Sequence, residues 1–156
     1  MGNKQDLFEL ADQAYQAGEY EKAFELFSRA SENGDSSAMS RLAMMYGDGE
    51  GVAYDFDKSV YWDMRAIEEG CLSSMSNLAI TYRNHGDARE ARKWFEKAYK
   101  AGDADAALEL AKLLMVSDKE LDQVRILLEQ VARSDAACSA SVDEAKQILI
   151  DLEKGA

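Results

Sequence analysis

The sequence of 156 residues contains no proline. Proline fixes φ and lacks a backbone donor, so a chain without it has no residue that must interrupt a helix. Ala, Leu, Glu, Lys and Met, which favour helices, dominate the composition, and β-branched residues do not cluster. The sequence therefore predicts an all-α fold, and its length suffices for one domain with a buried core.

Cysteine and histidine are scarce as well. The two cysteines, Cys71 and Cys138, lie far apart and form no C-x-x-C pair, which is typical of reduced thiols and excludes a disulfide scaffold. One histidine cannot form a Cys/His ligand set, so we expect no zinc site and no cofactor. That histidine, His85, stands between Asn84 and Gly86, residues typical of a turn. No motif supports a catalytic residue, and we expect a protein that is not an enzyme.

Long apolar runs are absent too. The chain has no stretch of about 18 apolar residues, so we expect no membrane-spanning helix. The first ten residues, MGNKQDLFEL, lack the continuous apolar stretch of a signal peptide. Asp6 stands where N-myristoylation requires Ser or Thr. Together these absences predict a cytoplasmic location.

Positive charge is in short supply, and the formal net charge is -12. Such an excess of acid disfavours nucleic acid as a partner, because phosphate binding needs local positive charge, and it favours a protein partner with a basic surface. The segments 1–35, 36–72, 73–104 and 105–156 carry net charges of -5, -4, +2 and -5. The third segment is therefore a basic island in an acidic chain.

The most distinctive local stretch is YGDGEGVAYDFDKSVYW, residues 46–62. A dinucleotide-binding loop needs G-x-G-x-x-G, but Val52 stands where the third glycine would follow Gly47 and Gly49. The Gly-Lys-Ser/Thr that ends a P-loop is also missing here. The spacing of acidic residues also differs from that of a calcium loop. The pattern is typical of a turn between two helices, with Asp55 as the N-cap of the second.

The chain repeats itself with offsets of 36 and 32 residues. The segments 27–46, 63–82 and 95–114 align in register, and a weaker fourth copy follows. The matched columns are Ala30/Ala66/Ala98, Gly34/Gly70/Gly102, Leu42/Leu78/Leu110 and Ala43/Ala79/Ala111. A repeat of this length indicates one helix pair per copy, and stacked pairs bury a continuous core that a single pair cannot.

These copies predict a single α-solenoid domain, residues 1–156, of about four stacked antiparallel helix pairs. The copies occupy about 1–35, 36–72, 73–104 and 105–138. Residues 139–156, with an apolar stripe along one face, are expected to form a C-terminal capping helix. Trp62 and Trp94 occupy matched positions and are expected to lie in the core between helices.

The segment from Leu42 to Gly70 resembles a Sel1-like repeat, a relative of the tetratricopeptide repeat. The matching residues are Leu42, Ala43, Tyr46, Gly49, Gly51, Asp55, Lys58, Trp62, Ala66 and Gly70. Ser59 stands where that family usually has Ala, the first copy is closer to a tetratricopeptide repeat, and the third and fourth depart further. The resemblance covers roughly residues 7–134, and it implies a concave groove along the first helix of each pair that binds a protein or peptide.

Carried onto this sequence, the resemblance implies a set of groove residues that is acidic at one end and has apolar spots. The candidates are Glu9, Asp12, Tyr15, Arg41, Met44, Asn77, Ile80, Arg83, Asn84, Glu109, Lys112 and Met115. Serines between them leave room for a partner's chain. Arg41 and Arg83 are expected to bind carboxylates or carbonyls through their planar guanidinium groups.

Two function hypotheses follow. The first is a non-catalytic interaction module, an adaptor or regulator that binds a peptide or partner protein in the groove. The alternative is a dedicated inhibitor, such as an immunity protein that neutralises a basic toxin or enzyme, since opposite charges speed such association. The sequence leaves the partner's identity and the oligomeric state open.

Overall fold

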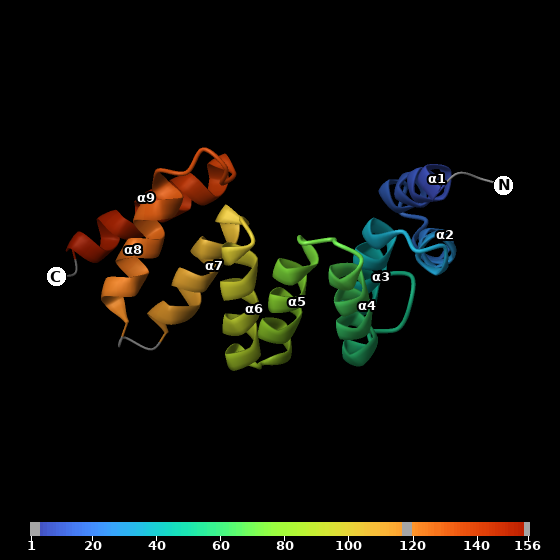
Figure 1. Ribbon diagram of the computed structural model, residues 1–156, viewed down its shortest axis with the longest axis horizontal. Helices are drawn as coiled ribbons and strands as arrows, with labels where there is room; N and C mark the ends of the chain where they lie inside the picture. Colours follow the sequence, from blue (N-terminus) through green and yellow to red (C-terminus); the bar gives the residue numbers. More distant parts are fainter. Residues whose placement is uncertain (1–3, 117–119, 155–156) are drawn as a thin grey trace. The chain divides into compact units, whose positions relative to one another are not determined.

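The computed structural model describes residues 4–116 and 120–154 (Figure 1). The described residues form helices and no strand, which confirms the all-α class. The helices are α1 (Lys4–Gln16), α2 (Tyr20–Glu32), α3 (Ser36–Asp48), α4 (Phe56–Glu68), α5 (Ser74–His85), α6 (Ala88–Lys100), α7 (Ala104–Met115), α8 (Leu121–Ala132) and α9 (Ser139–Lys154). No helix among these residues is both long and apolar enough to cross a membrane.

The chain forms two compact units, residues 1–86 with α1–α5 and residues 87–156 with α6–α9. In the first unit each helix packs against the next, and α3 also contacts α5. In the second unit α6–α9 pack in the same consecutive way, and α7 also contacts α9. Stacked helix pairs of this kind confirm the predicted α-solenoid class. The domain and copy boundaries stay predictions.

Aspartates begin several helices as N-caps. Each accepts hydrogen bonds from backbone N–H groups in the first turn, which otherwise have no partner within the helix. Asp55, the N-cap that the sequence predicts, accepts from Lys58 N at 3.0 Å, and Asp87 accepts from Glu90 N at 3.0 Å. Asp35 and Asp103 cap α3 and α7 in the same way. The first turns of these helices are therefore set by local sequence.

In the second helix of each pair, the most buried side chain lies one residue after the position that the sequence predicts for the core. Trp62 and Trp94 are only half-buried, whereas the residue that follows each of them is fully buried. This deepest position lies four residues after a small or β-branched buried residue and three before another. Its occupants are Phe27 in α2, Asp63 in α4, Phe95 in α6 and Leu128 in α8.

Asp63 is thus a carboxyl group where the other helices have a large apolar side chain. It is 1% exposed, and neither of its oxygens makes a hydrogen bond of ordinary geometry within the described residues. Burial raises the pKa of Asp63 to about 8, and the nearby Ser74 hydroxyl lowers it only in part. The carboxyl is therefore protonated at neutral pH in the folded chain.

Candidate partner-binding groove

The glycine-rich segment is an ordered connection between α3 and α4. Gly51 has φ +69°, and a Cβ at this position would lie 2.3 Å from the carbonyl oxygen of Tyr20, the first residue of α2. Only glycine allows this approach, because any side chain would collide with backbone. Tyr15 of α1 donates a hydrogen bond to the carboxylate of Glu50, so the loop is held against both helices of the first pair.

Two adjoining pockets lie in the first unit and together form what we call the groove. The loop pocket, of about 110 Å³, is lined by Met44, Gly47, Asp48, Tyr54, Asn77, Ile80, Thr81 and Asn84. The serine pocket, of about 280 Å³, is lined by Phe8, Ser37, Ser40, Arg41, Met44, Cys71, Ser73 and Asn77. Met44 and Asn77 line both pockets, so the two adjoin at α3 and α5.

A hydrogen bond between helices holds the middle of the groove. Asn77 of α5 donates through Nδ2 to Ser40 Oγ of α3 at 3.0 Å. Ser40 is buried, whereas Met44, one turn further along α3, is 37% exposed. The groove therefore combines a polar floor fixed by Asn77 with an accessible apolar side chain on its wall.

The acidic end of the groove holds Arg41 in place. Its guanidinium lies 3.5 Å from the Asp12 carboxylate and 5.8 Å from the centre of the Tyr15 ring. The hydrogen bond to Glu50, and then burial, raise the pKa of Tyr15 to about 12, so its hydroxyl keeps its proton. Arg41 is consequently positioned by Asp12 and Tyr15 of α1, and Tyr15 is itself held by its hydrogen bond to Glu50 of the loop.

The predicted groove residues separate into four groups, three of which lie in the first unit. Five of them line the two pockets: Arg41, Met44, Asn77, Ile80 and Asn84. Asp12 and Tyr15 contact Arg41 from α1. Glu9 and Arg83 are exposed and line neither pocket.

The remaining three candidates, Glu109, Lys112 and Met115, lie on α7 in the second unit. Lys112 forms ion pairs with Glu109 at 2.9 Å and with Glu144 of α9 at 3.0 Å. Burial lowers the pKa of Lys112, but the hydrogen bonds and charges of Glu109 and Glu144 together outweigh it and raise the pKa overall. Within its own unit Lys112 therefore joins α7 to α9, in addition to any role in binding that the sequence predicts.

Sequence reasoning did not include Asp48, Tyr54 and Thr81 among the groove residues. Asp48 is the last residue of α3, and Tyr54 lies in the loop that follows. Both positions fall outside the helical spacing that predicts the groove. The glycine-rich turn was the available signal, because loops often carry binding residues. His85, whose ring stacks on Phe56 with ring centres 3.8 Å apart, has a packing role at the end of α5.

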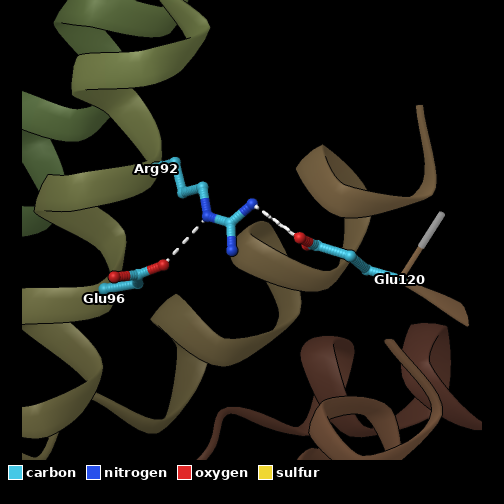
Figure 2. Close-up of polar contacts among 3 residues, drawn as sticks. All are labelled: Arg92, Glu96 and Glu120. Atoms are coloured by element: carbon cyan, nitrogen blue, oxygen red, sulfur yellow. Dashed lines mark hydrogen bonds and ion pairs between the residues drawn. The ribbon is translucent and has the colours of Figure 1, made fainter. Parts of the chain in front are cut away.

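The basic residues of α6 are largely engaged with neighbouring side chains of the second unit. Arg92 donates to Glu96 at 3.0 Å and to Glu120, which precedes α8, at 3.0 Å. Figure 2 shows both contacts. The hydrogen bond to Glu96 is the main cause that raises the pKa of Arg92. Lys93 pairs with Glu90, and Lys97 Nζ lies 3.8 Å from the centre of the Trp94 ring. Arg92 and Lys93 are thus paired with carboxylates, and Lys97 contacts an aromatic ring.

Metal-binding side chains do not gather into a site in the part of the chain that the structure describes: no three His, Cys, Asp or Glu residues come together there.

The sequence itself matches known repeat families. Residues 7–35 and 36–70 match the Sel1 repeat, and residues 71–101 match the tetratricopeptide repeat. These matches span more than half of the chain, which therefore belongs to the Sel1-like and tetratricopeptide-like repeat proteins. Among curated proteins, no sequence matches this chain.

Solved structures share the fold. A Sel1 repeat protein from Oxalobacter formigenes superposes with a TM-score of 0.76 at 18% identity, covering 94% of this chain and 61% of its own. The protein c5321, a protective antigen of uropathogenic Escherichia coli strains with an SLR fold, superposes at 0.69 with 26% identity. That alignment covers 84% of this chain and 30% of c5321. BtubC from P. vanneervenii superposes at 0.72 with 16% identity, covering 96% and 71%.

The chain thus spans less than two thirds of the first two of these proteins. Repeats of this class generally mediate protein–protein interactions, and their fold is typically non-catalytic.

Proposed function

We propose that this chain is a non-catalytic interaction module that binds an extended segment of a partner protein in the groove of its first unit. The observation that supports it most directly is that the loop pocket and the serine pocket adjoin, with Met44 and Asn77 lining both. A single chain in extended conformation fits such a path, because its successive side chains can enter neighbouring pockets.

The chemistry of the lining favours a peptide over a small apolar ligand. Met44 and Ile80 supply apolar contact, while Asn77, Asn84 and Thr81 supply hydrogen-bonding groups. Three serines in the second pocket leave space close to the helix backbones. Affinity in such interfaces comes from a few well-packed anchors surrounded by polar contacts, which this mixture of side chains provides.

A test uses peptides selected from a random library on the wild-type protein and measured by titration calorimetry. Met44→Trp places a larger neutral side chain at the junction of both pockets and should weaken peptide binding about tenfold or more through steric exclusion. Met64→Trp on α4 is the matched control, since both methionines are 37% exposed and only Met44 lines the groove.

We expect Met64→Trp to leave the affinity within about twofold of wild type, as for substitutions away from specific contacts. Equal affinities for the two variants would contradict binding in the groove. If the only tight ligand were one folded basic protein, bound one to one and released at high salt, the inhibitor hypothesis would replace the adaptor.

A further inference from the structure

The loop pocket contains one carboxylate in an unfavourable setting. Asp48 is the last residue of α3, where the negative end of the helix dipole disfavours an acidic side chain. Partial burial, and then the nearby charge of Glu50, raise the pKa of Asp48. None of the described ion pairs involves Asp48; Lys58, in the first turn of α4, pairs with Asp55 at 3.4 Å. In the free protein, therefore, no ion pair among the described residues balances this charge.

The rest of the pocket suits an aliphatic stem with a cationic end. Met44 and Ile80 provide apolar walls, and Tyr54, which is 59% exposed, adds an aromatic ring of the kind that attracts cations. The amide oxygens of Asn77 and Asn84 accept hydrogen bonds from N–H donors. A volume of about 110 Å³ holds a single side chain, so the pocket fits one residue of a bound segment.

We propose that the loop pocket binds a lysine or arginine side chain of the partner segment, whose cationic end pairs with Asp48. This inference rests on the proposed function, because it names the residue that the groove recognises. Long basic side chains lay their methylene groups along apolar surface and keep the charge at the tip, which suits a pocket lined by both apolar side chains and a carboxylate. The positive charge would offset the repulsion from Glu50 and from the helix dipole, and the ion pair would compensate for the partial burial of Asp48.

The complementary charge extends beyond the pocket. Residues 1–72, which supply most of the groove, carry a formal net charge of -9 from the two acidic segments of -5 and -4, which becomes -8 when Asp63 is counted as protonated. The ion pair of Asp12 with Arg41 occupies the one arginine that lines the serine pocket. A basic segment is therefore drawn to this face from a distance, while Asp48 gives it a specific position.

The test is a positional library of synthetic peptides, each with Lys, Arg, norleucine or Glu fixed at one site and random residues elsewhere. Norleucine retains the aliphatic stem and lacks the ammonium group. On wild-type protein we expect Lys or Arg to be preferred over norleucine by about tenfold at one position, as for a charge-assisted hydrogen bond that is partly shielded from water. Raising the salt concentration should reduce this preference.

The matched variants are Asp48→Asn and Asp57→Asn. Each removes one negative charge from the first unit, and Asp57 is an exposed residue of α4 that does not line the groove. Asp48→Asn should abolish the preference for a basic side chain and leave the affinity for the norleucine peptide unchanged. Asp57→Asn should preserve the preference. Circular dichroism should show both variants folded, since Asp48→Asn removes an acid from a helix C-terminus.

The two proposals can fail separately. Peptides that bind the groove, as judged by loss of affinity in Met44→Trp, without any preference for a basic residue would overturn the cationic pocket and leave the interaction function intact. The cationic pocket would also be overturned if Asp48→Asn and Asp57→Asn reduced the preference equally, since only net charge would then matter. Peptides insensitive to Met44→Trp would overturn both proposals.

Discussion

Asp63 occupies in α4 the position that Phe27 occupies in α2, and both side chains are buried from solvent. The phenyl ring of Phe27 packs edge-on against Phe8 at 5.5 Å, whereas the carboxyl of Asp63 has no hydrogen bond of ordinary geometry among the described residues. The same structural position therefore stabilises one helix pair by apolar contact and leaves the other with a polar group removed from water. This difference has a measurable consequence for stability.

We predict that the free energy of unfolding falls as the pH rises from about 5 to about 8. The unfolded carboxyl of Asp63, with its ordinary pKa of 3.8, is ionised over this range, whereas the folded carboxyl, with a pKa of about 8, stays protonated. The folded state alone holds the proton, so each pH unit lowers the stability by up to about 1.4 kcal/mol. Urea denaturation at several pH values measures the slope.

Asp63→Asn should remove most of this slope, because the amide does not titrate. Asp57→Asn, on the exposed side of the same helix, should keep the slope of the wild type. Asp63→Leu, which introduces the residue type found at the equivalent position 128, should also raise the stability at pH 8. A wild-type stability that stayed constant or rose over this range would show that the carboxyl is ionised and solvated in the folded chain.

Gly51→Ala should destabilise the first unit by about 2 kcal/mol or more, through a left-handed φ and a collision with the Tyr20 carbonyl at 2.3 Å. Gly49→Ala is the control, because Gly49 also has a positive φ of 71° but its nearest contact would be an ordinary 3.5 Å. That variant should lose only about 1 kcal/mol. Thermal unfolding distinguishes them, and equal losses would mean that the loop does not pack on α2.

Phe95→Ala should cost about 3–5 kcal/mol, the usual range for removing a buried aromatic ring. Trp94→Ala in the same helix should cost distinctly less, since Trp94 is half-buried and its ring also contacts Lys97 at 3.8 Å. Denaturant titration of both variants gives the two free energies. A larger loss for Trp94→Ala would place the deepest position of α6 one residue earlier than the structure does.

Deleting residues 139–156 should partly unfold the second unit or cause aggregation. The helix α9 buries Ala145 and packs along α8, and its Glu144 pairs with Lys112 at 3.0 Å. Its removal would expose the apolar surface of α8, as happens when a solenoid loses its terminal helix. Analytical ultracentrifugation and circular dichroism are the measurements. A monomeric truncation with unchanged stability would make α9 a detachable segment, and Lys112→Ala should then also be neutral.

The sequence by itself determined the helices and their repeat. Capping residues such as Asp55 and Asp87, the glycines at matched positions and the recurring small residues all act within a few residues along the chain. Such local effects depend little on what lies elsewhere, so their pattern is visible in one dimension. The groove residues on α3 and α5 followed from the same helical spacing, carried over from the resemblance to known repeats.

Tertiary structure alone decided the burial order and the shape of the groove. Neighbouring residues on a helix differ in direction by about 100°, so a small rotation of the helix decides whether Trp62 or Asp63 faces the core. Spacing cannot fix that rotation, because it depends on how the adjacent helices pack. The loop and its pocket likewise depend on tertiary contacts: Gly51 packs against the Tyr20 carbonyl, and Asp48 lines the same pocket as residues of α5. These segments lie far apart in the sequence, so no local pattern predicts that they meet.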